Sequence, residues 1–307
     1  MNNDRKVQNL HPLPNEPVTV KVCGNVIEVR YMAVAPSGGV IQKLNADSFL
    51  DKRTGEVRAF DHTENRAESK ATVAQSLRNL WDIINTNLTD PDQALWVTLT
   101  YRENMKDSAR LYEDFRRFWL RFHYRYSAEY IVAAEPQARG AWHLHCLFLF
   151  PHKAPFIPND TIASLWRQGN TKTKSLKGLD NPGLYLTAYL GDMELSEVLM
   201  TPGLQGKQIV EKMVVDQGSK KKKAIIKGAR LSMYPPGFRL FRCSRGVKRP
   251  KIMHMTEAKA QAMIKDSPLV FEKTIEVKNN SGEILNTINY RQYNRMQKGE
   301  KRQQNND

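Results

Sequence analysis

Two histidines and a glutamate occupy a short stretch in which their spacing is suited to metal chemistry. His143 and His145 stand at the entrance of an apolar run that ends at Phe150 and has the length of a buried strand. Alternate residues of a strand point to the same face, so both imidazoles are expected on one side of a sheet. Residues 130–135 are also strand-like, and the turn-forming residues 136–140 separate the two segments.

A hairpin of this kind returns Glu135 to the neighbourhood of His145. Two imidazoles and one carboxylate are a suitable ligand set for a divalent metal with open coordination positions. A single histidine on a strand is usually a core or surface residue. Two at alternate positions, with a carboxylate across a short turn, favour a metal site formed by Glu135, His143 and His145.

A second stretch that could do chemistry contains two tyrosines four positions apart. Asn181 is a good N-cap and Pro182 suits the first helical position, so we predict a helix that ends near Gly191. Tyr185 and Tyr189 then lie on one face of this helix, about one turn apart. Tyrosines at this spacing often pack against a sheet, but the histidines upstream shift the balance toward a catalytic role.

The overall charge points to a polyanionic partner. The 307 residues carry a net charge of +15 and the pI is about 9.7, which favours nucleic acid or an anionic membrane surface. No run approaches the ~18 apolar residues of a membrane span, and the N-terminus lacks a signal-peptide core, so we predict nucleic acid and no membrane partner. Cys23, Cys146 and Cys243 are too few and too scattered for a disulfide framework, and we expect the reducing cytoplasm of a bacterium.

Basic residues are concentrated in two further places. Beyond residue 200, cations are interleaved with Tyr234, Phe238 and Phe241, a composition suited to a groove that pairs phosphates and stacks bases. Arginines also follow the polar side of an amphipathic helix predicted around Leu111 to Phe122, although such a row is often only solvated. The lysine run near residue 220 could equally be a solvated loop. The predicted DNA-binding residues are Arg117, Arg121, Lys220, Lys221, Lys227, Arg230, Arg239, Arg242 and Arg245.

The rest of the pattern places these stretches in a chain of four parts. We predict a disordered arm over residues 1–16, β-hairpins and a helix over 17–90, a central domain over 91–255, and a partly disordered extension over 256–307. The expected elements are hairpins over 18–31 and 49–57, helices over 69–85 and 161–166, strands over 95–101 and 271–277, and a basic loop over 172–177.

The sequence Glu-Pro-Gln-x-Arg-Gly-x-x-His-Leu-His at residues 135–145 resembles the metal motif of HUH endonucleases, the rolling-circle replication initiators of plasmids and small phages. In that family the histidines hold Mg or Mn, and an upstream acidic residue, here Glu135, often completes the site. The resemblance covers residues 95–250 and includes an apolar strand that ends in Leu99-Thr100. It implies an α+β, ferredoxin-like domain whose antiparallel sheet carries the metal on one face, with the tyrosine helix against it.

The order of histidines before tyrosines also resembles the initiators. The spacing of Tyr185 and Tyr189 is similar to the two-tyrosine motif of microvirus gene A proteins, but the lysine found there three residues after each tyrosine is replaced by Ala188 and Asp192. Some plasmid initiators keep only the second tyrosine of the pair. The resemblance therefore makes Tyr189 the first candidate nucleophile and Tyr185 its alternate, with a basic residue from the C-terminal part in place of the lysines.

The implied activity is site-specific nicking and rejoining of single-stranded origin DNA, such as a hairpin, through a 5′-phosphotyrosine that initiates rolling-circle replication. A host polymerase would extend the free 3′ end, and a host helicase would open the duplex, because the chain has no phosphate-loop motif. Two other classes stay open. They are a non-enzymatic DNA-binding protein and a metal-dependent oxygenase, since two histidines and a carboxylate also suit non-haem iron.

Overall fold

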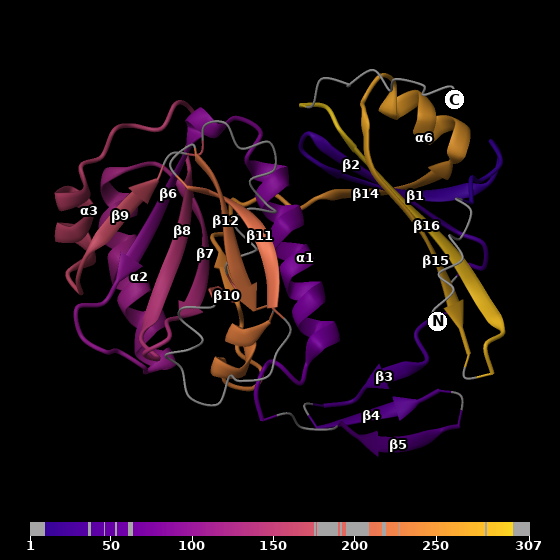
Figure 1. Ribbon diagram of the computed structural model, residues 1–307, viewed down its shortest axis with the longest axis horizontal. Coiled ribbons are helices and arrows are strands. Elements are labelled where there is room, and N and C mark those ends of the chain that lie inside the picture. The colour runs from indigo at the N-terminus through magenta and orange to yellow at the C-terminus, as the bar shows by residue number, and fades with distance from the viewer. Residues whose placement is uncertain are drawn as a thin grey trace. The chain divides into compact units, whose positions relative to one another are not determined.

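The computed structural model describes residues 10–296, apart from 36–37, 46, 53, 61–63, 175, 177–189, 191, 195–208, 217–218, 227 and 280. It is a mixed α+β structure with antiparallel sheets and four α-helices among the described residues. The chain divides into two compact units (Figure 1), which are Glu64–Pro250 and the combination of Met1–Thr63 with Lys251–Asp307. None of the described helices is both long and apolar enough to cross a membrane.

The unit Glu64–Pro250 is built on a five-stranded antiparallel sheet. Its spatial order is β13-β7-β8-β6-β9, so the two most apolar strands, β6 and β8, have neighbours on both sides and lie in the interior. The strands are β6 (Ala94–Thr100), β7 (Glu129–Pro136), β8 (Trp142–Leu149), β9 (Thr171–Lys174) and β13 (Phe241–Cys243).

One face of this sheet is covered by α2 (Ser108–Arg125) and α3 (Asn159–Trp166). The Asp107 side chain caps α2 by accepting hydrogen bonds from the backbone N–H groups of Ala109 and Arg110. The predicted apolar stripe of α2 is buried against the sheet, with Phe118 and Phe122 packed on Phe148 of β8. Burial of each such ring stabilises the fold by roughly 1.5–3 kcal/mol.

The opposite face is partly covered by α1 (Lys70–Asn87). Leu80 and Ile84 of α1 pack in one buried cluster with Trp96 and Leu147 from the sheet. Side chains alternate along β8, so His143 and His145 lie on the same face as Leu147. The histidines therefore project on the side of the sheet that α2 and α3 do not cover.

The remaining elements of this unit are short. They are η1 (Pro91–Gln93), η2 (Ala229–Met233), and a three-stranded sheet of β10 (Met193–Glu194), β12 (Ser219–Ile226) and β11 (Ile209–Asp216). Two loop interpretations were wrong. Residues 171–174 form strand β9 through pairing with β6, and the lysine run near residue 220 belongs to β12, which pairs with β11.

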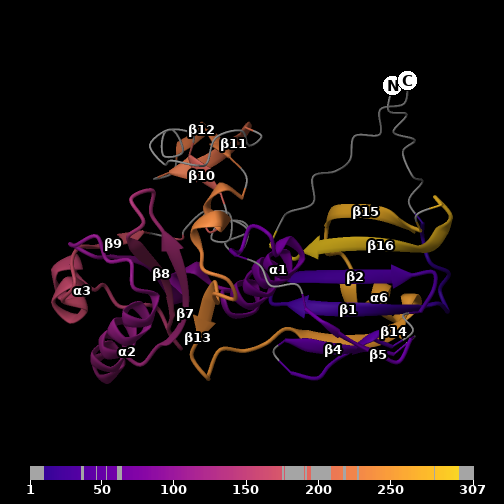
Figure 2. The same ribbon diagram turned by 90° about the horizontal axis from the view of Figure 1, so that it is seen from below.

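The other unit contains a second five-stranded antiparallel sheet (Figure 2), in the order β14-β1-β2-β16-β15. Helix α6 (Glu257–Ile264) packs on one face, where Ala260 and Ile264 meet Val20 and Val29. The strands are β1 (Pro17–Cys23), β2 (Val26–Met32), β14 (Lys251–Thr256), β15 (Leu269–Lys278) and β16 (Ile284–Asn294); a separate three-stranded sheet holds β3 (Ile41–Lys43), β4 (Ser48–Asp51) and β5 (Glu56–Ala59).

Both ends of the chain are more ordered than the sequence predicted. Residues 10–16 are held by hydrogen bonds, such as the one that Tyr31 donates to Glu16 at 2.7 Å, while residues 1–9 lie outside the described part. The Asn/Gln-rich sequence after residue 283 forms β16, between β2 and β15. The two ends thus share one sheet, which differs from the predicted order of consecutive domains.

Candidate active site

The β7–β8 hairpin brings the three predicted metal ligands together. His143 lies directly opposite Glu135 in the antiparallel ladder, and His145 follows two residues along β8. Opposed residues share a face of the sheet. The turn between the strands uses Gly140 at a φ of 86°, a conformation that glycine adopts at little cost.

His145 is held on three sides. Its Nε2 is hydrogen-bonded to Glu135 Oε2, and its Nδ1 lies 3.3 Å from the Thr98 hydroxyl. Its ring stacks on Trp96 at a centroid distance of 5.4 Å. Sequence reasoning missed Thr98 and Trp96 because the register of β6 against β8 is set by packing. The only available signal was that β6 is apolar and ends in Leu-Thr.

His143 presents an unusual nitrogen. Its Nε2 is buried and has no hydrogen-bond partner among the described residues. Burial, with His145 and then Arg139 and Arg230, lowers the pKa of His143 to about 4, against the opposing effect of Glu135. At neutral pH the imidazole is therefore uncharged, which is the form that binds metals. A buried polar atom without a partner is costly, and a bound cation would satisfy it.

Glu135 stays ionised although it is buried. Burial raises the pKa of its carboxyl group, but His145, Arg230 and His143 together lower it below the ordinary value. Oε1 of Glu135 lies 3.0 Å from Nη1 of Arg230, while Oε2 is taken by His145. The carboxylate thus has a positive partner on one side and an imidazole on the other.

The donor set fits a divalent metal, but the side chains are not already in the geometry of a bound ion. In the described part of the chain, no group of three His, Cys, Asp or Glu residues stands in such a geometry. Glu135 and His145 are hydrogen-bonded to each other, so binding would replace that hydrogen bond with bonds to the ion. Two imidazoles, an ionised carboxylate and the unpartnered Nε2 of His143 are the features that fit.

Arg230 is an interior residue rather than the surface DNA contact that the sequence predicted. It is only 5% exposed. Besides pairing with Glu135, it donates to the carbonyl oxygen of Pro136 at 2.6 Å and to that of Asp192 at 3.2 Å. The guanidinium group therefore joins the metal-ligand hairpin to the segment that follows the predicted tyrosine helix.

Tyr234 makes a second connection between the same two segments. Its buried hydroxyl lies 2.9 Å from the carbonyl oxygen of Ala134 and 3.0 Å from that of Leu190, so one donated proton is shared between them. Leu190 packs in the cluster that contains Trp96, on the histidine face of the sheet. Tyr185 and Tyr189 themselves lie outside the described residues.

Arg139 is the cation at this site without an acidic partner. Its Nε donates to Gln137 Oε1 at 3.0 Å, and its Nη2 donates to the carbonyl oxygen of Tyr101 at 3.4 Å. Among the described residues it has no ion pair, and its side chain is exposed. The residue before Tyr101 is Thr100, which pairs with His143. Arg139 is thus held beside the histidines with N–H groups still available.

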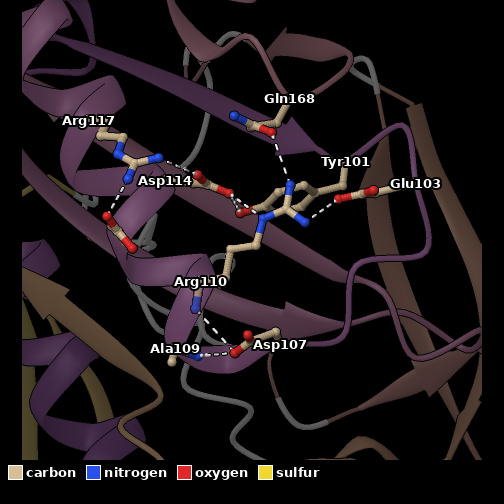
Figure 3. A network of polar contacts seen from close by, with 9 residues as sticks. Tyr101, Glu103, Asp107, Ala109, Arg110, Asp114, Arg117 and Gln168 are labelled. Atoms are coloured by element: carbon tan, nitrogen blue, oxygen red, sulfur yellow. Dashed lines mark hydrogen bonds and ion pairs between the residues drawn. The ribbon is translucent and has the colours of Figure 1, made fainter.

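The predicted arginines of α2 are already engaged with protein groups (Figure 3). Arg117 pairs with Glu113 one turn away and lies 3.9 Å from Asp114. Arg121 is half-buried and donates to the carbonyl oxygen of Leu165 at 2.8 Å. A carboxylate beside Arg117 competes with any phosphate, so this helix face is a poor DNA surface.

The predicted C-terminal groove is only partly supported by the placement of its members. Tyr234 and Phe238 are core residues and are not available to stack bases. Arg242 stacks on the Tyr112 ring, with 3.4 Å between the guanidinium carbon and the ring centroid. Arg239, Arg242 and Arg245 are exposed, Lys220 and Lys221 lie on β12 with undescribed side chains, and Lys227 lies outside the described residues.

Residues 94–194 match a family model of replication-associated proteins, the ORF2 type. The match supports a Rep-type replication initiator. It begins at the first residue of β6 and ends at the last residue of β10, so it includes Glu135, both histidines and both tyrosine positions. No curated protein and no solved structure matches the chain.

Proposed function

We propose that this protein is a metal-dependent HUH-type endonuclease that nicks and rejoins single-stranded DNA at a replication origin and so initiates rolling-circle replication. The observation that carries the proposal is the convergence of Glu135, His143 and His145 on one sheet face, inside the segment that matches a replication-associated family. The unpartnered, uncharged His143 supports a metal site over a structural pair of histidines.

The order of elements supports a ferredoxin-like nuclease domain. From β6 to β9 the chain runs strand, helix, strand, strand, helix, strand, and the sheet order is β7-β8-β6-β9. This is the split β-α-β arrangement of ferredoxin-like domains. Both helices pack on one face, so the opposite face is left for the ligands and the nucleophile.

Glu135, His143 and His145 would hold Mg²⁺ or Mn²⁺. When bound, the ion would offset the charge that builds on the phosphate oxygens and would orient the phosphodiester. The chain prepares this by keeping His143 uncharged and Glu135 ionised. Arg230 neutralises part of the carboxylate charge and fixes its direction through the 3.0 Å ion pair.

Tyr189 is the proposed nucleophile and Tyr185 its alternate. Tyrosine has an unperturbed pKa of about 10, so the phenol needs help to attack. Its oxygen forms a bond to phosphorus while the bond from phosphorus to the 3′ oxygen breaks; the phenol loses a proton and the 3′ oxygen gains one. Leu190, the neighbour of Tyr189, is anchored on the histidine face through Tyr234, which supports this assignment.

Arg139 is our candidate for the role of the lysines that are absent after the two tyrosines. Ala188 and Asp192 occupy those positions and cannot neutralise a phosphate. Arg139 lies close enough to His143 to contribute to its pKa shift, and its guanidinium has no acidic partner. A guanidinium held in this way matches the geometry of phosphate oxygens.

The products explain why such a site suits replication. Cleavage leaves a free 3′ hydroxyl for a host polymerase and keeps the 5′ end on the tyrosine. The phosphotyrosine preserves the energy of the ester, so rejoining needs no ATP. The second tyrosine would cut the next copy of the origin while the first still holds the displaced strand, and a host helicase would open the duplex.

Covalent adduct formation tests the proposal. The protein is incubated with Mn²⁺ and single-stranded oligonucleotides that tile the DNA around its own gene, and adducts are resolved on denaturing gels. We expect one sequence to yield a protein-linked 5′ end. The adduct should disappear in the Tyr185→Phe/Tyr189→Phe double variant and in His143→Gln.

Tyr124→Phe is a matched control, because Tyr124 is 93% exposed on α2 and belongs to no part of the proposed site. It should react like the unmodified protein. An adduct that persists in the double tyrosine variant would overturn the proposed chemistry. Salt-sensitive binding without any adduct would leave a non-enzymatic DNA-binding protein.

A further inference from the structure

The sheet β14-β1-β2-β16-β15 has a second face that α6 does not cover. Its register places one residue from each strand in a single row across this face, because opposed residues of an antiparallel ladder share a side. In strand order the row is His254, Thr19, Arg30, Tyr290 and Lys273. The 3.3 Å contact between the Thr19 hydroxyl and His254 Nδ1 confirms that side chains of the row point the same way.

The cations of this row have no acidic partners. Arg30 and Lys273 are exposed, and the described residues offer their side chains no hydrogen bond or ion pair. Tyr290 lies between them in the row, paired with Arg30 on one side and Lys273 on the other. An aromatic ring flanked by two unpaired cations is the combination that stacks a base and pairs the adjoining phosphates.

A neighbouring row adds a second aromatic ring. It contains Ile252, Lys21, Glu28, Gln292 and Phe271. Its one acid, Glu28, forms an ion pair with Lys21 and is thereby neutralised. Phe271 is 50% exposed on the edge strand β15, so a flat apolar ring is presented to solvent next to the basic row.

The distribution of charge on β15 separates the two faces. Phe271, Lys273, Ile275 and Val277 all lie on the open side and are exposed. Glu272 points to the α6 side, where it accepts a hydrogen bond from Asn289 at 3.1 Å. The acids of the strand are thus used inside the unit, while its cation and apolar side chains face outward.

We propose that this open face, defined by Arg30, Tyr290, Lys273 and Phe271, is a binding surface for single-stranded DNA. Net positive charge without acidic partners requires a polyanion, and half-exposed rings between the cations require flat, unpaired bases. A duplex hides its bases and offers only phosphates, and a protein partner would need a large apolar patch in place of this cationic row. This surface is additional to the nuclease site and does not depend on the tyrosine chemistry.

Binding of a fluorescent oligo(dT) to the full-length chain, measured by anisotropy in EDTA, tests the surface without cleavage. The test variant is Arg30→Gln/Lys273→Gln. The matched control is Lys259→Gln/Lys265→Gln, which removes two exposed lysines at and beside the end of α6, on the covered side of the sheet. Each phosphate contact on a single strand contributes about 0.7 to the slope of log affinity against log salt.

We expect the test variant to bind about tenfold more weakly at 150 mM salt and to lower the salt slope by about 1.4 relative to the control. Phe271→Leu should weaken binding by on the order of fivefold, because a lost base stack costs at least that much. A duplex of equal length should bind with no dependence on Phe271. Equal affinity and slope in the two double variants would overturn the proposal. Since no metal or nicking enters this measurement, its failure is separate from failure of the nuclease assignment.

Discussion

Two arginines near the histidines have opposite roles because of what surrounds them. Arg230 is buried and its charge is balanced by Glu135. Arg139 is exposed and bonded only to neutral oxygens of Gln137 and Tyr101. A balanced cation fixes the geometry of its partner, whereas an unbalanced one attracts an anion. The sequence ranks them the other way, since Arg230 lies in a basic stretch and Arg139 in a turn.

Replacing Arg139 tests its assignment to the scissile phosphate. Arg139→Gln should slow adduct formation by about 100-fold, the usual effect of losing one group that stabilises developing negative charge, and Arg139→Lys should restore part of the rate. Binding of Mn²⁺, followed by titration, should stay unchanged, because Arg139 is not a proposed ligand.

Arg125→Gln serves as its control, since Arg125 is an exposed arginine in the last turn of α2. It should leave the rate of adduct formation unchanged. An equal loss of rate in the two variants would show that only overall charge matters. Loss of Mn²⁺ affinity in Arg139→Gln would indicate a structural role.

At the scale of elements, the connection from α3 to β9 depends on a glycine that the sequence did not single out. Gly169 runs so close to β6 that a Cβ atom there would lie 2.3 Å from the Thr100 carbonyl oxygen and 2.5 Å from the Arg102 nitrogen. Both are backbone atoms of a central strand and its extension, so they cannot move aside cheaply. Thr100 is also the residue that pairs with His143.

Gly169→Ala should therefore lower the free energy of unfolding by ~2 kcal/mol or more, the cost of overpacking a site that cannot relax. Urea unfolding followed by fluorescence would measure it. Gly38→Ala, where a Cβ would meet nothing within 4 Å, should change the free energy of unfolding by less than about 0.5 kcal/mol. Equal stabilities of the two variants would show that β9 is not packed as described.

Helix α6 is fixed to its sheet by a buried ion pair between Glu257 and Arg291. Arg291 Nη1 and Nη2 donate to the two carboxylate oxygens at 2.6 and 2.7 Å. Burial raises the pKa of Glu257, but the hydrogen bonds from Arg291 and Gln261 lower it overall below its ordinary 4.5. A carboxyl group with a lowered folded pKa stabilises the fold above pH 4.5, and this contribution is lost as the pH falls through the folded value.

Glu257→Gln should destabilise this unit by about 3 kcal/mol at pH 7, because it leaves a buried guanidinium without its countercharge. The difference from the unmodified protein should shrink as the pH is lowered below 4.5. Glu276→Gln, which breaks the partly exposed pair with Lys278, should cost at most about 1 kcal/mol. Thermal unfolding between pH 3 and 7 would measure both; a constant difference across that range would contradict the ionic explanation.

At the scale of the whole molecule, the first and last segments of the chain complete one sheet. β1 pairs with β14, and β2 pairs with β16, across more than 200 positions of sequence. The central unit is inserted between these segments. An Asn/Gln-rich C-terminal sequence that looks dispensable therefore supplies an interior strand.

Truncation separates these two views of the C-terminal sequence. A chain that ends at Lys278 lacks β16, so β2 and β15 lose their common neighbour and Glu257 loses Arg291. Limited proteolysis should then cut within residues 17–32, and the unit should no longer unfold cooperatively. A chain that ends at Met296 should behave like the full-length protein. Equal protease resistance of the two truncated chains would contradict the assigned topology.

The sequence by itself determined the local features. Alternation placed His143 and His145 on one face, the short turn returned Glu135 beside them, and the apolar stripe of α2 predicted its buried side. These depend on neighbours within about fifteen residues, where covalent geometry and periodicity limit the choices. The positions of Tyr185 and Tyr189 in space stay a prediction.

Only the tertiary structure decided which distant residues meet. Arg230 reaches Glu135, Tyr234 joins Leu190 to Ala134, and Arg30 and Tyr290 stand side by side, because the register of each sheet is set by packing of whole faces. A shift of one residue would turn every side chain of a strand to the opposite face. No local pattern specifies that register across 50 to 260 positions, so the buried arginine and the basic row could not be predicted from sequence.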